Sequence, residues 1–169
     1  PRVSWAKSKS FHADAGAEGS FLWGDRTWNW DVTYGYSEAR DSRTDSGNIN
    51  LVNAAKALGP TAVVNGNVVC ASPADRAAGC VPWNILAGPG GTPADVWNYV
   101  SSTTTAHQVT RTNDFVANLT GGIFDLPAGT VRAAGGLEHR DENGRYVPDP
   151  ADSAGLTTQL ASNPTSGGY

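Results

Sequence analysis

The chain has 169 residues, a formal net charge of −4 and a charged fraction of 17%, so it lacks the concentrated positive charge of nucleic-acid-binding proteins. Leu, Ile, Val and Phe account for 30 residues, about 18% of the chain and below the roughly 20% typical of an independent hydrophobic core. Intrinsic disorder fits no better, because 6 Trp and 5 Tyr accompany a low net charge. With 20 Gly and 10 Pro, the composition favours extended segments joined by turns, and we predict an all-β fold.

The first predicted element is a hairpin of two long strands. Residues 11–21 alternate between Phe, Ala or Gly at odd positions and mostly polar residues at even positions, which is the period of a strand. A turn follows at residues 23–26. From Trp28 to Tyr36 aromatic residues and Val32 again alternate with polar residues, so each strand has one apolar face and one polar face.

After Arg40 the alternation is lost, and residues 41–104 are predicted to form a long loop with short helices. Apolar residues recur at near-helical spacing in residues 48–58 and stop at a Gly-Pro pair, which predicts a short helix. Asn65-Gly66 predicts a turn, and residues 88–91 form a flexible run. Thr92 is the predicted N-cap of a second short helix, with a first-turn proline, that ends near Val100.

The loop also contains the two cysteines, Cys70 and Cys80, separated by a spacer rich in Pro, Ala and Gly. The three His residues lie far from this pair in the sequence, so a zinc site is disfavoured and no metal is expected. We predict a local disulfide, which implies an oxidising compartment such as the periplasm or the cell exterior.

A second hairpin is predicted in residues 105–141. Alternation returns after Val109, with Phe115, Ala117, Leu119 and Ile123 on the apolar face. Residues 125–129 form a turn, and the alternation continues through residues 131–140. Residues 142–169 are again polar and rich in Gly, Pro and Ser, like the opening of another long loop, and residues 162–169 show no strand pattern.

The order of these segments is a hairpin (1–40), a long loop (41–104), a second hairpin (105–141) and the start of a further loop (142–169). Tight turns on one edge and long loops on the other are typical of outer-membrane β-barrels. The aromatic residues Trp28, Trp30, Tyr34 and Tyr36 span about 26 Å of strand, or about 20 Å along a barrel axis tilted by roughly 40°, which approaches the ~25 Å apolar band between the aromatic girdles of such a barrel. No segment approaches the ~20 apolar residues of a spanning helix, so a helical membrane protein is excluded.

The sequence resembles the TonB-dependent outer-membrane receptors. The motifs that carry the resemblance are spread in the expected order over most of the chain: WNWDVTYGY at 28–36, GCVPWN at 79–84, the short helix at 93–100 and GLEHRDE at 136–142. The family usually has an aromatic residue where His139 stands, which weakens one girdle position.

The resemblance implies a fragment of a 22-stranded barrel that surrounds a plug domain and imports a scarce nutrient, such as a siderophore or an oligosaccharide, with energy from the TonB system. Four strands cannot close a barrel, which needs about eight. The expected partners are therefore the rest of the barrel and plug, the TonB system, outer-membrane lipid and an unidentified small ligand, in the bacterial outer membrane. The chain starts at Pro1 and has no Met, which also favours a processed or excised piece.

Candidate site residues are few. The loop contains three aromatic residues of interest, Trp83, Trp97 and Tyr99. They either pack within the loop or form a platform that stacks on a sugar or aromatic ligand. Glu138, Arg140 and Arg132 form either a charge ladder in the barrel lumen or solvated charges that pair with neighbouring strands. No catalytic residues, enzyme activity or cofactor are predicted: His12 and Asp14 lack a nucleophile or third partner at a readable spacing, and the Asn118-Leu119-Thr120 sequon is interpreted as accidental.

Two alternatives remain. A detached barrel fragment exposes unpaired strand edges and apolar faces, so it would self-associate, and the same strands would stack as an extracellular cross-β fibre or matrix. The third hypothesis is a secreted carbohydrate-binding module or glycosidase, which would explain the Trp content. It predicts a sandwich with a turn every 8–12 residues, and the loop of about sixty residues argues against it.

Overall fold

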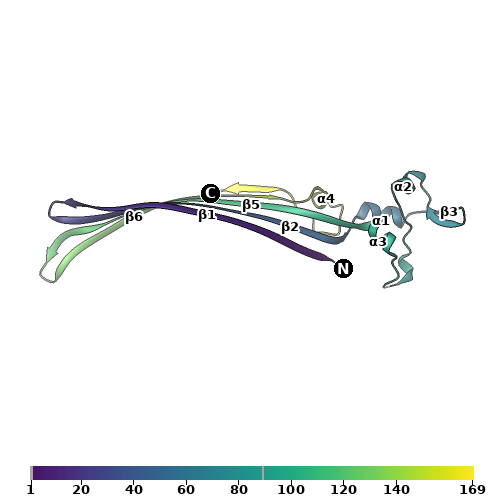
Figure 1. The fold of residues 1–169 in the computed structure, drawn as a ribbon, viewed down its shortest axis with the longest axis horizontal. Helices are drawn as coiled ribbons and strands as arrows, with labels where there is room; N and C mark the ends of the chain where they lie inside the picture. Colours follow the sequence, from purple (N-terminus) through teal and green to yellow (C-terminus); the bar gives the residue numbers. More distant parts are fainter. Residues whose placement is uncertain (1, 89) are drawn as a thin grey trace. The chain divides into compact units, whose positions relative to one another are not determined.

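The computed structural model describes residues 2–88 and 90–169 (Figure 1), which divide into two compact units. The sheet unit consists of Ser8–Asp41, Gln108–Tyr146 and Thr165–Tyr169. The loop unit consists of Pro1–Lys7, Ser42–His107 and Val147–Pro164.

The main sheet has five strands in the order β1-β2-β5-β6-β7. Their bounds are β1 Val3–Trp23, β2 Arg26–Ile49, β5 Ser101–Leu126, β6 Gly129–Val147 and β7 Thr165–Gly168. Most of the chain is thus antiparallel β-sheet, which confirms the all-β prediction at this level. The two predicted hairpins are β1–β2 and β5–β6, and both tight turns lie at one end of the sheet unit (Figure 1).

Two predictions about strand ends were wrong. β2 does not end near Arg40 but continues to Ile49, where hydroxyl pairs between strands, such as Thr44 with Thr105 at 3.1 Å, take the place of apolar alternation. The C-terminal segment does contain a strand, because β7 pairs with β6 from Asn143↔Gly168 to Tyr146↔Thr165. Its Gly-rich sequence pairs through the backbone alone, so no side-chain pattern marks it.

Glycines opposite tryptophans set the packing on the apolar face of the sheet unit. A Cβ placed on Gly19 of β1 would lie 2.8 Å from the Trp30 ring of β2, and a Cβ on Gly121 of β5 would overlap the Trp28 ring. Each indole therefore lies flat over a strand that has no side chain at that point. This is the glycine-covering arrangement by which aromatic residues stabilise strands interrupted by Gly.

A bidentate ion pair joins the two hairpins near their turns. The Arg26 guanidinium of β2 donates to both carboxylate oxygens of Asp125 on β5, at 2.8 and 3.2 Å. Thr130 of β6 donates its hydroxyl to the same carboxylate at 2.6 Å. Three adjacent strands are thereby held in one register next to the turns, because paired Arg and carboxylate groups restrict geometry as well as attract.

The sheet unit has no hydrophobic core. Among its described residues only Gly121 is buried, and every described residue of β1 except Gly19 is exposed. Large side chains of the apolar face remain open to solvent, including Phe11 at 60%, Tyr34 at 48% and Leu137 at 60% exposure. The sheet therefore leaves uncovered the apolar surface that a soluble domain would bury.

The loop unit holds the short helices and a small core. Its elements are α1 Leu51–Ala57, β3 Thr61–Val64, β4 Asn67–Cys70, α2 Pro73–Ala77, the 3₁₀ turn η1 Ile85–Ala87, α3 Ala94–Val100 and α4 Pro150–Ser153. Ala57, Val96 and Val100 form the buried centre, where α1 packs on α3. The predicted helices at 48–58 and up to Val100 and the turn at Asn65-Gly66, which joins β3 to β4, are confirmed.

The predicted N-cap of the second helix was wrong. The cap residue of α3 is Pro93, with no side-chain cap, whereas the Thr92 hydroxyl accepts a hydrogen bond from the Trp83 indole at 3.2 Å. The tertiary contact therefore uses the hydroxyl that the local pattern assigned to the cap. None of the helices in the described segments is long and apolar enough to cross a bilayer.

Candidate functional site

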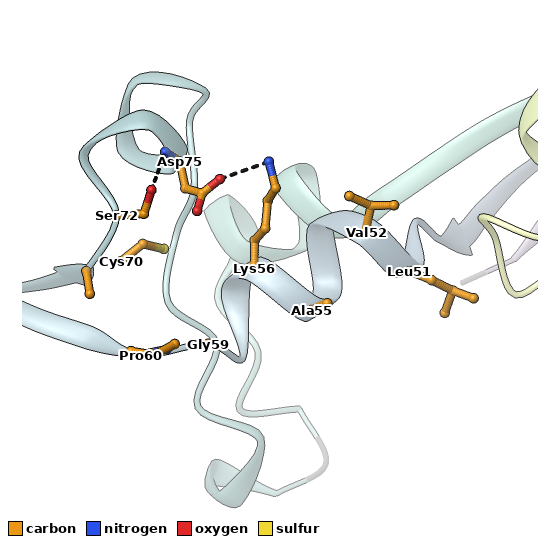
Figure 2. A pocket seen from close by; sticks show the side chains of 10 residues that line it. Leu51, Val52, Ala55, Lys56, Gly59, Pro60, Cys70, Ser72 and Asp75 are labelled. Carbon is orange, nitrogen blue, oxygen red and sulfur yellow. Dashed lines mark hydrogen bonds and ion pairs between the residues drawn. The ribbon is translucent and has the colours of Figure 1, made fainter.

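A groove with a volume of about 700 Å³ opens on the loop unit (Figure 2). Its floor comes from α1 and its far wall from the segment that links β4 to α2. Its lining is mostly aliphatic and comprises Leu51, Val52, Ala55, Lys56, Gly59, Pro60, Cys70, Ala71, Ser72 and Asp75. The side chains of Leu51 and Val52 are more than two-fifths exposed, at 44% and 43%, so α1 presents apolar surface to the groove without covering it.

One ion pair spans the groove between its two walls. Lys56 Nζ of α1 lies 2.8 Å from Asp75 Oδ1 of α2, as Figure 2 shows. Hydrogen bonds with Lys56 and then with Ser72, the N-cap residue of α2, lower the pKa of Asp75. The same ion pair raises the pKa of Lys56. Both groups are therefore charged over the ordinary pH range and provide one acceptor and one donor beside an apolar surface.

The predicted disulfide between Cys70 and Cys80 is present and forms part of this wall. The two Cα atoms are 6.2 Å apart, and the bond closes a segment with a sequence separation of 10. Inside it, Arg76 Nη1 donates to the carbonyl oxygens of Cys70 and Ala71 at 2.7 and 2.8 Å. The bridge and these bonds fix the far wall, which has no buried side chain of its own in α2.

The groove suits a small, largely apolar ligand with one polar or charged group. Aliphatic side chains offer contact area, and the Lys56–Asp75 pair offers a single point for orientation. Within the residues that the structure describes, no group of three or more His, Cys, Asp or Glu side chains is placed to hold a metal ion. Helical spacing in the sequence indicated α1, but no sequence signal indicated which of its faces stays open.

The predicted ligand platform occupies a different place. Trp83, Trp97 and Tyr99 are half-buried and pack against the loop core of Ala57, Val96 and Val100. The backbone of this segment is also engaged: Trp83 N donates to Ala57 O at 2.8 Å, and Asn53 Nδ2 donates to Tyr99 O at 2.9 Å. Packing accounts for all three side chains, and none of them lines the groove.

The aromatic residues predicted as a membrane girdle lie in two groups along β2. Trp28 stacks at a tilt on Trp23 next to the turn, with ring centroids 5.7 Å apart. Eight residues farther on, Tyr36 lies 6.2 Å from Phe11 of β1. The two hydroxyls at that end meet polar partners, Tyr34 with Asn113 at 2.8 Å and Tyr36 with Glu38 at 3.2 Å.

The opposite face of the sheet unit carries paired charges. Arg140 Nη2 of β6 lies 2.9 Å from Glu138 and 3.2 Å from Asp114 of β5, which fits the interpretation of charges that pair with neighbouring strands; Arg132 is exposed. Asn118 of the sequon donates to Asp31 at 2.8 Å.

His12 and Asp14 lie 3.2 Å apart, and both side chains are about two-thirds exposed, at 65% and 64%. Neither is held by a third group in a way that would favour acid–base chemistry.

No protein-family model matches the chain, and no curated protein is significantly similar to it.

Proposed function

We propose that the chain forms part of the wall and one extracellular loop of an outer-membrane nutrient receptor. The observation that carries the proposal is the sheet unit itself. It has one continuous apolar face, one charged face and no core, so something other than its own chain must cover the apolar side. In a barrel wall, lipid covers that side and water fills the other.

The aromatic residues support this placement by their spacing and by their partners. Between Trp28 and Tyr36 the strand advances about 26 Å, or roughly 20 Å along a barrel axis at a tilt near 40°. Trp and Tyr at both ends of an apolar band are the residues that membrane interfaces favour. The hydroxyls of Tyr34 and Tyr36 bond to polar side chains, as expected where the band ends.

The edges of the sheet also favour a larger assembly. β1 is an edge strand of 21 residues, and β6 pairs with the C-terminal segment only over Glu142–Tyr146. Unpaired backbone groups on such long edges require further strands in a membrane. The rest of the barrel would supply them on both sides.

The loop unit is the proposed site of ligand capture. Its groove is fixed by a disulfide and two helices, and it offers apolar contact beside the Lys56–Asp75 pair. A scarce nutrient with a largely apolar body and one polar or charged group would bind there before transport. The proposed coupling of transport to the TonB system rests on the family resemblance, which the motifs at 28–36, 79–84, 93–100 and 136–142 carry.

Fluorescence quenching tests the membrane placement. The chain is reconstituted in phosphatidylcholine vesicles whose acyl chains carry bromine, which quenches indoles in contact with it. The measurement uses three variants, in each of which one of Trp28, Trp30 and Trp83 is the sole tryptophan. We expect strong quenching of Trp28 and Trp30 and little quenching of Trp83 in the loop. Equal quenching of all three, or a soluble monomer that folds cooperatively in detergent-free buffer, would contradict the proposal.

A second candidate is a self-assembled fibre, and the open edge of β1 is the observation that favours it. All but one of its described residues are exposed, and a long, flat, exposed edge invites pairing with a second chain. In that case, the purified chain would sediment as fibres with strands about 4.8 Å apart along the axis. Insertion into vesicles without such fibres favours the receptor wall.

A further inference from the structure

A carboxylate holds two arginines side by side where the aromatic row on β2 ends. Glu38 lies two residues beyond Tyr36 on the same face, and its side chain is only 14% exposed. It accepts hydrogen bonds from Arg40 Nε at 2.5 Å and from Arg111 Nε of β5 at 2.7 Å. The Tyr36 hydroxyl donates to the same carboxylate at 3.2 Å.

This arrangement leaves the outer ends of both guanidinium groups open. Each arginine donates its Nε atom to Glu38, and no ion pair of the described chain engages the Nη atoms of Arg40 or Arg111, although the Tyr36 hydroxyl lies beside Arg111. The two side chains are 62% and 52% exposed. Their Nη groups are therefore available to a ligand from outside the chain.

A third cation lies on the neighbouring strand. Gly16 contacts Thr33 and Gly19 contacts Trp30 across β1 and β2, and this spacing places Lys9 opposite Arg40. Lys9 also shares the face of Phe11, which is in contact with Tyr36. We name Lys9, Arg40 and Arg111, grouped around Glu38, the cationic cluster; it has a net charge of +2 in a chain of −4.

The cluster is organised before any ligand arrives. Hydrogen bonds from Arg111 and then Arg40 lower the pKa of Glu38 to about 2, so its carboxylate stays ionised and keeps both arginines in place. Two guanidinium groups with free Nη donors are suited to the oxygens of a phosphate, which arginine binds through paired hydrogen bonds.

We propose that the cationic cluster binds phosphate groups on the headgroups of the surrounding lipid. The inference rests on the proposed membrane placement of the sheet unit. The position supports lipid over a soluble anion, because the cluster continues the apolar face directly past Tyr36, so its ligand must also border acyl chains. Basic residues at the edge of a membrane segment are the usual recognition element for anionic headgroups.

Partitioning into vesicles tests the inference. The full chain is mixed with phosphatidylcholine vesicles with and without bis-phosphorylated lipid A, and the bound fraction is measured by flotation. We expect lipid A to strengthen binding of the unaltered chain, and Arg40→Gln and Arg111→Gln each to reduce this gain about fivefold, since a basic residue near an anionic surface contributes a factor of that order. Lys9→Gln, which breaks none of the ion pairs among the described residues, should reduce it similarly if the arginine variants fail to fold.

Arg132→Gln is the matched control, because it removes the same charge from the other face of the sheet unit, and it should keep the full gain. Equal binding to both kinds of vesicle, or an equal loss in the control, would overturn the inference while leaving the membrane placement intact. Loss of the gain in an excess of inorganic phosphate would assign the cluster to a free anion instead of lipid. Failure to bind phosphatidylcholine vesicles at all would contradict the proposed function itself.

Discussion

Replacing Gly121 with Ala tests the packing of the apolar face most directly. Gly121 is the one buried residue among those described in the sheet unit, and the Trp28 ring lies over it. A Cβ at this point would overlap the ring, so Trp28 must leave its place between β2 and β5. Overpacking of this kind typically costs about 1–3 kcal/mol.

Gly135→Ala on β6 is the matched control. An added Cβ there meets nothing within 4 Å, and replacing a strand Gly with Ala removes an entropic cost of roughly 0.5–1 kcal/mol. The two variants carry the same chemical change, yet their effects on the free energy of unfolding should have opposite signs. Because the backbone gain is common to both variants, their difference should equal the overpacking cost of about 1–3 kcal/mol.

Urea unfolding of the vesicle-bound chain, followed by tryptophan fluorescence, measures both effects. Equal midpoints for the two variants would refute the assignment of Trp28 to the surface of β5.

Val32→Arg places a charge on the apolar face in mid-strand and should make the free energy of assembly in the membrane less favourable by about 2–4 kcal/mol. Thr33→Arg faces the charged side and should cost far less. Equal assembly of the two variants would mean that the strand register is wrong. Cys70 and Cys80 should resist thiol labelling until a reductant is added, and stoichiometric labelling without it would contradict the bond. The pKa of Asp75 is depressed below its ordinary 3.8, so its ion pair contributes fully above that pH and is lost on further acidification, which NMR titration of the carboxylate should show.

Alternation of side chains predicted the strands only where one face is apolar. From Phe11 to Phe21 and from Trp28 to Tyr36 the two faces differ in polarity, and both segments are strands. Beyond Arg40 both faces of β2 are polar, so the pattern disappears although the strand continues. Pairs such as Ser46 with Thr103, at 3.0 Å, maintain the pairing there, and such hydroxyl contacts depend on a partner strand that lies far away in the sequence.

The groove was beyond prediction for a related reason. The α1 side, near Lys56, and the α2 side, near Asp75, meet only because the β3–β4 hairpin reverses the chain between them and the disulfide holds the returning segment. Sequence reasoning identified α1, the turn at residues 65–66 and the cysteines, but not the cavity that they enclose. It interpreted Trp83, Trp97 and Tyr99 either as packing of the loop or as a ligand platform, and the structure packs these side chains on the small core of the loop unit.

The sheet unit and the loop unit differ in what stabilises them, and this difference carries the functional argument. The loop unit buries Ala57, Val96 and Val100 and is cross-linked by a disulfide, so its groove has a rigid frame of its own. The sheet unit depends on strand pairing and on whatever covers Phe11, Tyr34 and the other exposed apolar side chains. Because lipid would cover that face and leave the paired charges of Glu138 and Arg140 in water, one environment satisfies both faces at once. A fibre would have to bury or stack those charges, which costs free energy unless each finds a partner, and this favours the membrane wall.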